Sequence, residues 1–513
     1  MTDNSSVENN KWADGFSFSV RSSGILLHLT SLPGEHGSGD LGPAAHHFTE
    51  FLEKSGQSWW QMLPVGPVGH PPSFSPYDSP SSFAGSSELI SLSKLAEEGL
   101  LSYADIKPVP GLSESRVNFP AMLQYRQGLL NKAFEAFCSG QGQKNPEYIL
   151  FCRKNSDWLD DYALFMALHH ESGGKRWTKW KPDLRSRRPA ALHDARQRLA
   201  NEINRHRFIQ FKFDNQWMKL RVKAHQSGIG LIGDLPIFGA LDSADVWSYQ
   251  ELFRLDRKGM PLCVSGYPPD RFNKNGQLWG HPQYRWKEHK KNNFEWWVRR
   301  FERMFDLFDA VRIDHFLGFT RTWSIPASSG SAAEGRWVKS PGESLLTAVK
   351  DKLGPRPFIA EDLGHVTDAD IRLREMFDMA PMRIFQFGFG SEDDAAVHLP
   401  HNYDRLCAAY TGNHDMNNIS GWFSNLTQAR RRQVLMYTGG SQELIHLDSI
   451  RVLLCSPANI VIFPLQDLLG LGTRARMNVP GTIHKNWGWR LSSELRDETA
   501  RQLRNQSELF GRI

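Results

Sequence analysis

The stretch Leu307–Phe316, LFDAVRIDHF, is a mostly apolar run that carries Arg312, Asp314 and His315 toward its end. A run of this kind favours a strand buried on both faces of a parallel sheet, because half-exposed strands alternate apolar and polar residues instead. Seven other short runs have the same character. They are Gly24–Leu32, Ser58–Pro67, Gly228–Phe238, Arg356–Gly364, Pro381–Phe387, Arg405–Asp415 and Asn459–Gly470.

Eight such runs, mostly separated by stretches able to form helices, predict an α/β chain folded as a (β/α)8 TIM barrel. Polar residues gather at the C-terminal ends of the runs, where barrel enzymes place their active sites. These residues are Asp234, Asp314, His315, Glu361, Asp362, His414 and Asp415. The barrel therefore predicts that side chains far apart in the sequence converge at one end.

The gaps between runs predict the domain organisation. We expect a disordered lead-in over 1–20 and a single catalytic barrel domain over 21–513, with no separate C-terminal β-domain. Residues 86–190 carry apolar residues at helical spacing and predict a helical insertion after strand two, followed by a barrel helix to about 226. Residues 239–306 are rich in Gly, Pro and aromatics, and predict a loop insertion after strand three, with another after strand four.

Composition excludes several classes of protein. The 513 residues are 40% hydrophobic and 23% charged with a net charge of +5, so a nucleic-acid partner is not indicated, and the basic segment 175–189 fits a solvated surface. The five cysteines are widely spaced without a CxxC pair, and the histidines lack HxH or HExxH spacing, so neither a disulfide framework nor a metal site is expected. No signal peptide or membrane span is apparent, which predicts a cytoplasmic protein. No cofactor is expected.

The chain also holds 17 tryptophans. Tryptophan rings stack on the apolar faces of sugars, but they also fill large cores, so the count alone does not separate the two uses.

Three strand-end carboxylates suit one chemistry. Retaining cleavage of a glycosidic bond needs two carboxyl groups about 5 Å apart, one a nucleophile and the other an acid/base. Asp314, Glu361 and Asp415 follow putative strands four, five and seven, so only a real barrel would bring them together.

The segments around these residues resemble a known family. VRIDHF (311–316), IAEDLG (359–364) and TGNHD (411–415) are similar to motifs of the α-amylase clan. Longer segments resemble the amylomaltases of glycoside hydrolase family 77, which are 4-α-glucanotransferases also called disproportionating enzymes. They include GDLPIF (233–238), GYPPDRF (266–272), GQLWGHPQYRW (276–286) and LQDLLGLGTRARMNVPGT (465–482), and the similarity extends from about 23 to 491.

This resemblance implies a role for each matching residue. Asp314 corresponds to the nucleophile, Glu361 to the acid/base, and Asp415 to the carboxylate that grips ring hydroxyls in the transition state. The remaining matches are sugar-binding residues: Tyr77 under the ring, Asp234 and His414 at the cleavage point, and Trp279 on the acceptor side. Arg312 lies two residues before Asp314 on the same side of a strand, so we expect it to hold that carboxylate ionised.

Two further histidines and several departures bear on the site. His28 could also contact sugar, whereas His315 is left out because neighbours along a strand face opposite ways. Arg271 and Leu317 stand where many relatives have Tyr and Arg, and Met416-Asn417 and the loop 70–74 (HPPSF) also differ from the usual pattern. These departures are expected to affect acceptor preference rather than bond cleavage.

The expected function is transfer of an α-1,4-glucan segment to the 4-OH of glucose or another glucan. Its partners would be α-1,4-glucans and maltooligosaccharides, and the chain would be a monomer or homodimer. Three alternatives stay open: an α-amylase-like hydrolase, a non-catalytic glucan-binding protein, and a metal-dependent barrel hydrolase. The metal alternative would need His and Asp ligands that the spacing does not reveal.

Overall fold

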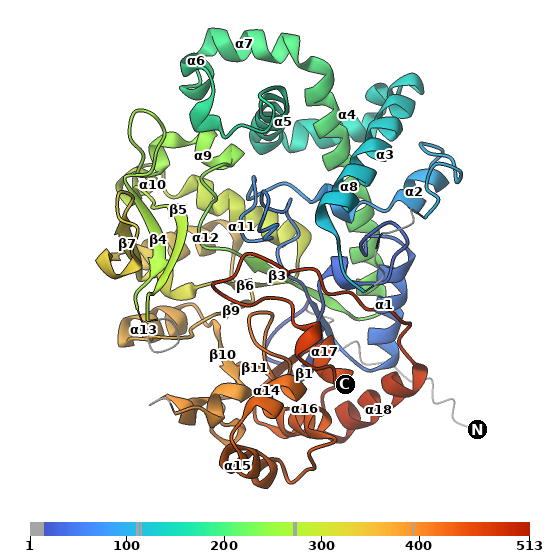
Figure 1. Cartoon of the computed structure of the whole chain (residues 1–513), viewed down its shortest axis with the longest axis vertical. Coiled ribbons are helices and arrows are strands. Elements are labelled where there is room, and N and C mark those ends of the chain that lie inside the picture. The colour runs from blue at the N-terminus through green and yellow to red at the C-terminus, as the bar shows by residue number, and fades with distance from the viewer. Residues whose placement is uncertain (1–14, 109–111, 113–114, 270–273, 392–393) are drawn as a thin grey trace, which may run out of the picture.

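The computed structural model describes residues 15–108, 112, 115–269, 274–391 and 394–513. Eight parallel strands close into a barrel in the order β1-β12-β11-β10-β9-β6-β3-β2 (Figure 1). Their bounds are Ser22–Leu26 (β1), Trp59–Gln61 (β2), Gly230–Leu235 (β3), Ala310–Ile313 (β6), Phe358–Ala360 (β9), Ala380–Ile384 (β10), Ala408–Tyr410 (β11) and Ile460–Pro464 (β12). Every predicted run overlaps one of these strands, so the predicted (β/α)8 barrel is confirmed.

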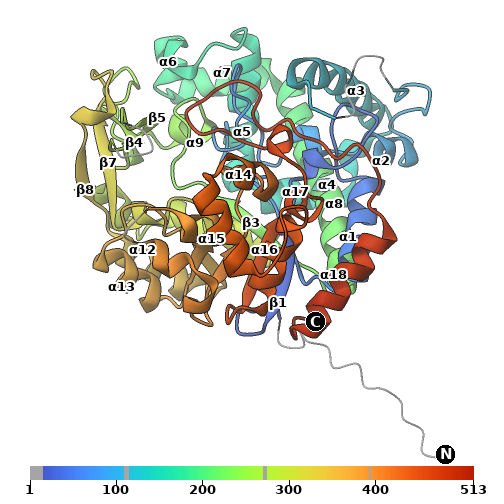
Figure 2. The same ribbon diagram turned by 60° about the horizontal axis from the view of Figure 1, so that its bottom comes forward.

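Helices surround the barrel. They are α1 (Pro43–Lys54), α8 (Ala200–Gln226), α11 (Glu295–Leu307), α12 (Gly342–Leu353), α13 (Asp368–Met376), α14 (Ile419–Asn425), α15 (Gln428–Thr438), α16 (Ile445–Cys455), α17 (Leu465–Leu468) and α18 (Asp497–Leu509). The chain between β10 and β11 forms short 3-10 turns in its described part instead of an α-helix. Helix α18 lies beside α1, where Arg504 donates to the carbonyls of Glu53 and Lys54 at 2.9 and 2.8 Å (Figure 2).

The segment between β2 and β3 holds several helices before α8, most of which pack on α8 (Figure 1). They are α2 (Leu92–Glu97), α3 (Phe119–Ser139), α4 (Pro146–Lys154), α5 (Ser156–Glu171), α6 (Pro182–Arg185) and α7 (Pro189–Arg198). Asn118 and Asn145 cap the N-termini of α3 and α4, and a proline follows each closely, as helix starts favour. The apolar spacing over 86–190 thus corresponds to real helices.

The insertions after β3 and β6 differ from the loops predicted for them. They contain α9 (Ala244–Ser248), α10 (Trp286–Lys291) and the strands β4 (Cys263–Tyr267), β5 (Gln277–Pro282), β7 (Arg321–Pro326) and β8 (Arg336–Lys339). These strands form one antiparallel sheet in the order β5-β4-β7-β8, beside the barrel in Figure 1. Each has only four to six residues and two are half-exposed, so none produces a long apolar run.

The beginning of the described chain packs on the barrel. Phe18 is 5% exposed and its ring lies 5.3 Å from that of Trp59, so Phe18 belongs to the core rather than to a disordered lead-in. The rest of the predicted lead-in, residues 1–14, lies outside the described residues. Among the described helices, none combines the length and apolar character needed to cross a bilayer.

Most tryptophans that draw attention in the sequence serve the core. Of the 17, eleven are buried within the described residues, and seven of these are less than 2% exposed: Trp59, Trp60, Trp177, Trp217, Trp247, Trp296 and Trp297. The tryptophan count therefore reflects packing first, and a sugar-binding role has to be argued residue by residue.

Candidate active site

The barrel brings the predicted carboxylates to one end. Asp314 follows β6 directly, and its backbone N–H donates to the carbonyl of Leu235 on β3 at 3.0 Å. Glu361 follows β9, and its N–H donates to the carbonyl of Ile313 at 3.1 Å. Both residues are therefore held by extensions of the barrel's own hydrogen-bond ladder, as expected for catalytic residues at strand ends.

A buried arginine joins the carboxylates. Arg312 lies opposite Asp234 in the β3–β6 pairing, and its Nη1 donates to both oxygens of Asp234 at 2.6 Å. Its Nη2 lies 3.2 Å from Oδ1 of Asp314 and 3.0 Å from Oε1 of Glu361. One guanidinium thus contacts carboxylates from three neighbouring strands.

The shared nitrogen limits the separation of the two catalytic candidates. Asp314 Oδ1 and Glu361 Oε1 lie 3.2 and 3.0 Å from Nη2 of Arg312. The distance between these two oxygens therefore cannot exceed the sum of the two values. Inverting enzymes need their carboxyl groups about 6.5–9.5 Å apart to admit a water, whereas retaining enzymes need about 5–5.5 Å. The facing oxygens fit the retaining arrangement.

The protonation of Asp314 differs from the sequence expectation. Burial and then the charge of Glu361 raise the pKa of Asp314 well above its usual range, although Arg312 opposes the change. Arg312 does not hold Asp314 ionised by itself, because its positive charge is divided among three carboxylates. Asp314 therefore retains its proton to higher pH than an isolated aspartate does.

Asp415 is held by a segment to which the sequence analysis gave no role. Its Oδ1 accepts from Asn478 Nδ2 at 2.6 Å, and its backbone carbonyl accepts from Arg476 Nη2 at 2.5 Å. Its other oxygen, Oδ2, lies 3.4 Å from Nε2 of His414. Arg476 and Asn478 fall within the 465–482 motif, so that motif was the signal that could have found them.

Tyr77, Asp234 and His414 form one hydrogen-bonded group. The Tyr77 hydroxyl donates to Asp234 Oδ2 at 2.7 Å and lies 2.9 Å from His414 Nε2. The rings of Tyr77 and His414 are nearly parallel with centroids 5.3 Å apart, and Trp487 lies 5.6 Å from the Tyr77 ring. Burial, followed by the charge of Asp234, raises the pKa of Tyr77, so this hydroxyl stays protonated.

Trp279 reaches the site through a residue that the sequence analysis left out. The Trp279 ring on β5 meets the His315 ring edge-on at 4.9 Å, and the His315 backbone N–H donates to Glu361 Oε2 at 2.6 Å. Alternation does not apply to His315, because β6 ends at Ile313 and His315 adopts a left-handed backbone conformation with φ of 49°. Burial lowers its pKa to about 4, so the ring is neutral near pH 7.

The remaining candidates have separate surroundings. His28 is buried, which lowers its pKa to about 3, and its Nδ1 has no hydrogen-bond partner within the described residues. Leu317 is fully buried beside the site, and Asn417 donates to Thr473 Oγ1 at 2.9 Å. Arg271 lies outside the described residues.

Comparison with known proteins agrees with this geometry. The family model described as 4-alpha-glucanotransferase matches residues 27–496. The chain belongs to this 4-α-glucanotransferase family. A 4-alpha-glucanotransferase of Aquifex aeolicus is 43% identical over 93% of this chain and 96% of its own length. One from Thermus thermophilus is 41% identical over 96% and 99%.

A solved family structure has the same fold. The amylomaltase from Streptococcus agalactiae, in complex with acarbose, superposes with a TM-score of 0.93 at 35% identity, covering 96% of this chain and 99% of that one. The family resemblance drawn from the sequence is thereby confirmed, and the chain is an enzyme of the glucanotransferase type. The assignment of individual residues to catalytic roles stays a prediction.

Proposed function

We propose that the chain transfers segments of α-1,4-glucans to the 4-OH of glucose or another glucan by a retaining double displacement. The observation that carries this proposal is the contact of Asp314 and Glu361 with the same nitrogen of Arg312. It supports a spacing suited to a covalent glycosyl intermediate. Near-full-length relatives named 4-alpha-glucanotransferase support transfer over hydrolysis.

In the first step, Asp314 attacks the anomeric carbon while Glu361 gives its proton to the departing glycosidic oxygen. In the second step, Glu361 takes the proton of the acceptor hydroxyl, whose oxygen displaces Asp314. The pair needs one proton in total, and the raised pKa of Asp314 beside Glu361 supports a pair that keeps one.

Other residues would bind the sugar at the cleavage point. Asp415, fixed by Asn478, has one oxygen left for ring hydroxyls, and Tyr77 offers a ring face supported by Asp234 and His414. Trp279 is only partly buried and would offer its face to an acceptor sugar. His315 joins this group because its Nε2 has no hydrogen-bond partner among the described residues.

Transfer has to overcome the concentration of water. Water is present at about 55 M and an oligosaccharide acceptor at millimolar levels, so acceptor binding must contribute about 6 kcal/mol to favour transfer. Orientation in a preformed site supplies effects of this size.

A non-catalytic glucan-binding protein would not need three strand-end carboxylates that all contact one arginine, with two of them on the same nitrogen of that arginine.

An experiment with labelled glucose tests the proposal. Incubation of maltooligosaccharides with radiolabelled free glucose should place label in maltose and longer products, because glucose acts as the acceptor. A hydrolase would leave the label in glucose.

We further propose a cytoplasmic location, although relatives from potato and Arabidopsis are named as chloroplastic. Whether the enzyme is a monomer or a homodimer stays a prediction.

A further inference from the structure

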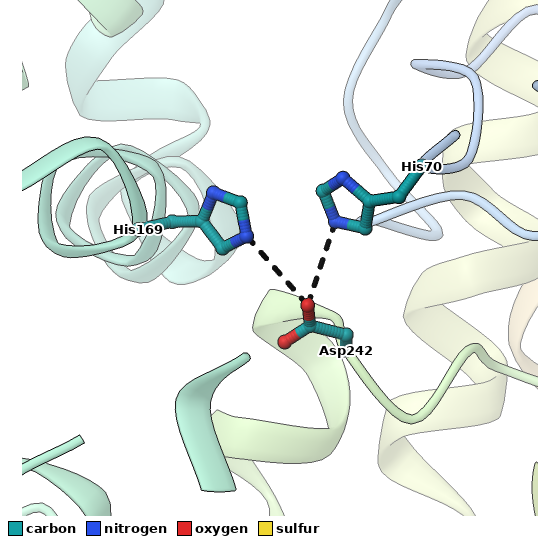
Figure 3. Close-up of side chains that lie close together, drawn as sticks. All are labelled: His70, His169 and Asp242. Atoms are coloured by element: carbon teal, nitrogen blue, oxygen red, sulfur yellow. Dashed lines mark ion pairs between the residues drawn. The ribbon is translucent and has the colours of Figure 1, made fainter. Parts of the chain in front are cut away.

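Three side chains outside the proposed active site point to one spot (Figure 3). His70 lies in the loop after β2, His169 near the end of α5, and Asp242 between β3 and α9. Nε2 of His70 lies 3.5 Å from Oδ2 of Asp242, and Nε2 of His169 lies 3.6 Å from the same oxygen. All three atoms lie within 4.8 Å of one another.

None of these three atoms has a hydrogen-bond partner within the described residues, although all three are shielded from solvent. Buried polar atoms are nearly always paired, and leaving one unpaired costs about 1–3 kcal/mol. The other Asp242 oxygen accepts from the backbone N–H of Trp177 at 3.1 Å, which orients the carboxylate. Three unpaired atoms converging on one spot indicate a missing partner with which all three could bond.

The chemistry of the atoms identifies that partner as a cation of the zinc type. Two imidazole nitrogens and one carboxylate oxygen form a ligand set typical of Zn²⁺ sites that keep one position for water. Ca²⁺ and Mg²⁺ prefer sets made of oxygen. A tetrahedral zinc ion with bonds of about 2.0–2.1 Å holds its ligand atoms about 3.4 Å apart, close to the two distances to Asp242.

We propose that His70, His169 and Asp242 bind one divalent transition-metal ion, with Zn²⁺ as the preferred ion and water as the fourth ligand. The side chains of His169 and Asp242 are only 12% and 10% exposed, whereas that of His70 is 42% exposed, so the ion and its water would enter beside His70. The two rings are nearly parallel with centroids 4.8 Å apart, and both direct Nε2 toward Asp242 (Figure 3).

Protonation is the competing explanation, in which an imidazolium pairs with Asp242. The distances of 3.5 and 3.6 Å from the two ring nitrogens to Asp242 are longer than the roughly 2.7–2.9 Å of a charge-assisted hydrogen bond, so neither ring forms a close ion pair with this carboxylate. A metal ligand must be a neutral imidazole, because a proton and the ion compete for the same nitrogen.

The ion would join three segments of the chain. The loop that carries His70 continues to Tyr77, whose hydroxyl bonds to Asp234 in the proposed active site. Bound metal would fasten this loop to helix α5 and to the segment before α9. We therefore expect bound metal to raise the stability of the fold and to restrict the motion of the loop between His70 and Tyr77, without changing the rate of bond cleavage. His70 also belongs to the 70–74 segment that departs from the family pattern.

The test uses the full-length chain stripped of metal with a chelator and then dialysed. Titration with ZnCl2 alone should reveal one tight site by calorimetry, and CoCl2 should give the intense visible absorption of four-coordinate Co²⁺. Zinc should raise the melting temperature, because an ion that binds only the folded state stabilises it. Chelator should reverse each effect.

His169→Gln and Asp242→Asn should each lose the tight zinc site seen by calorimetry, and with it the zinc-dependent rise in melting temperature. The matched control is His170→Gln, since His170 is the next residue on α5 but lies 3.3 Å from Glu202 instead. It should bind zinc as the wild type does. Equal tight binding by His169→Gln and the wild type would mean an adventitious surface ion and would overturn the proposal.

His70→Gln provides a second variant if either buried change prevents folding, because His70 is the most exposed of the three. Absence of a tight zinc site in the wild type, or Co²⁺ spectra typical of six-coordinate aqueous ion, would also overturn the proposal.

Discussion

Arg312 and Asp234 form a buried ion pair in which a single nitrogen, Nη1, donates to both carboxylate oxygens at 2.6 Å. Both side chains are 1% exposed. This pair fixes the guanidinium so that its other terminal nitrogen faces Asp314 and Glu361. The geometry of the proposed catalytic pair therefore depends on a residue that is itself held from a neighbouring strand.

Arg312→Lys should reduce kcat/KM by about 100-fold or more, because a lysine ammonium cannot replace two guanidinium nitrogens that face different carboxylates. Unfolding in urea should show a loss of about 3 kcal/mol, since a buried carboxylate loses part of its pairing. Arg303→Lys is a matched control, because Arg303 is also a buried arginine but pairs with Asp214 at 3.0 Å. It should lower stability while kcat of the folded enzyme stays within about two-fold. Similar kcat losses in both variants would contradict a specific role for Arg312.

Asp314→Asn should abolish turnover and raise stability at neutral pH. The folded state raises the pKa of Asp314, so ionising it costs stability as pH rises from about 3.9, the usual value, through the raised value. The amide removes that cost. The gain in melting temperature over the wild type should therefore be small near pH 4 and grow toward neutral pH. A gain in melting temperature that does not depend on pH would show that the charge of Asp314 is not the source of the gain. Residual activity of a tenth of the wild type would show that Asp314 is not the nucleophile.

Glu361→Gln should slow cleavage of natural glucans far more than cleavage of an α-glucosyl fluoride. Fluoride departs without a proton, so the first step no longer needs the acid. Initial rates with both donors, measured at saturating acceptor, give the comparison. Equal losses on both donors would mean that Glu361 does not protonate the leaving group.

Trp279→Ala should weaken the use of acceptor more than the cleavage of donor. The ring lies edge-on to His315, next to Asp314, so its loss removes a face on which an acceptor sugar can stack. The acceptor KM should rise about ten-fold, and the share of hydrolysis should increase with it. Trp337→Ala serves as control, because Trp337 lies in the same antiparallel sheet but packs against Arg321 and Tyr267.

Much of this fold was predictable because barrel strands are buried on both faces. Runs such as Leu307–Phe316 therefore stand out, and four of the eight runs carry candidate functional residues at their C-terminal ends. The sheet of β4, β5, β7 and β8 was missed because its strands are short and partly exposed. His315 was missed because the chain turns immediately after β6, so strand alternation no longer applies.

Other features depend on contacts that no local pattern contains. The sharing of Arg312 among three carboxylates comes from the register of neighbouring strands, which sets Asp234 opposite Arg312. The cluster of His70, His169 and Asp242 joins residues separated by 99 and 73 positions, so no ligand spacing could reveal it. Sequence spacing finds a metal site only when neighbouring residues supply its ligands.

The central claim is that an acceptor sugar, not water, receives the glycosyl unit from Asp314. Incubation of the enzyme with maltotriose alone, with products resolved by size and reducing ends counted over time, tests it most directly. We predict glucose together with maltotetraose, maltopentaose and longer chains, while the number of reducing ends stays nearly constant. A steady rise in reducing ends with no product longer than maltotriose would contradict the account, because it would show that water is the acceptor.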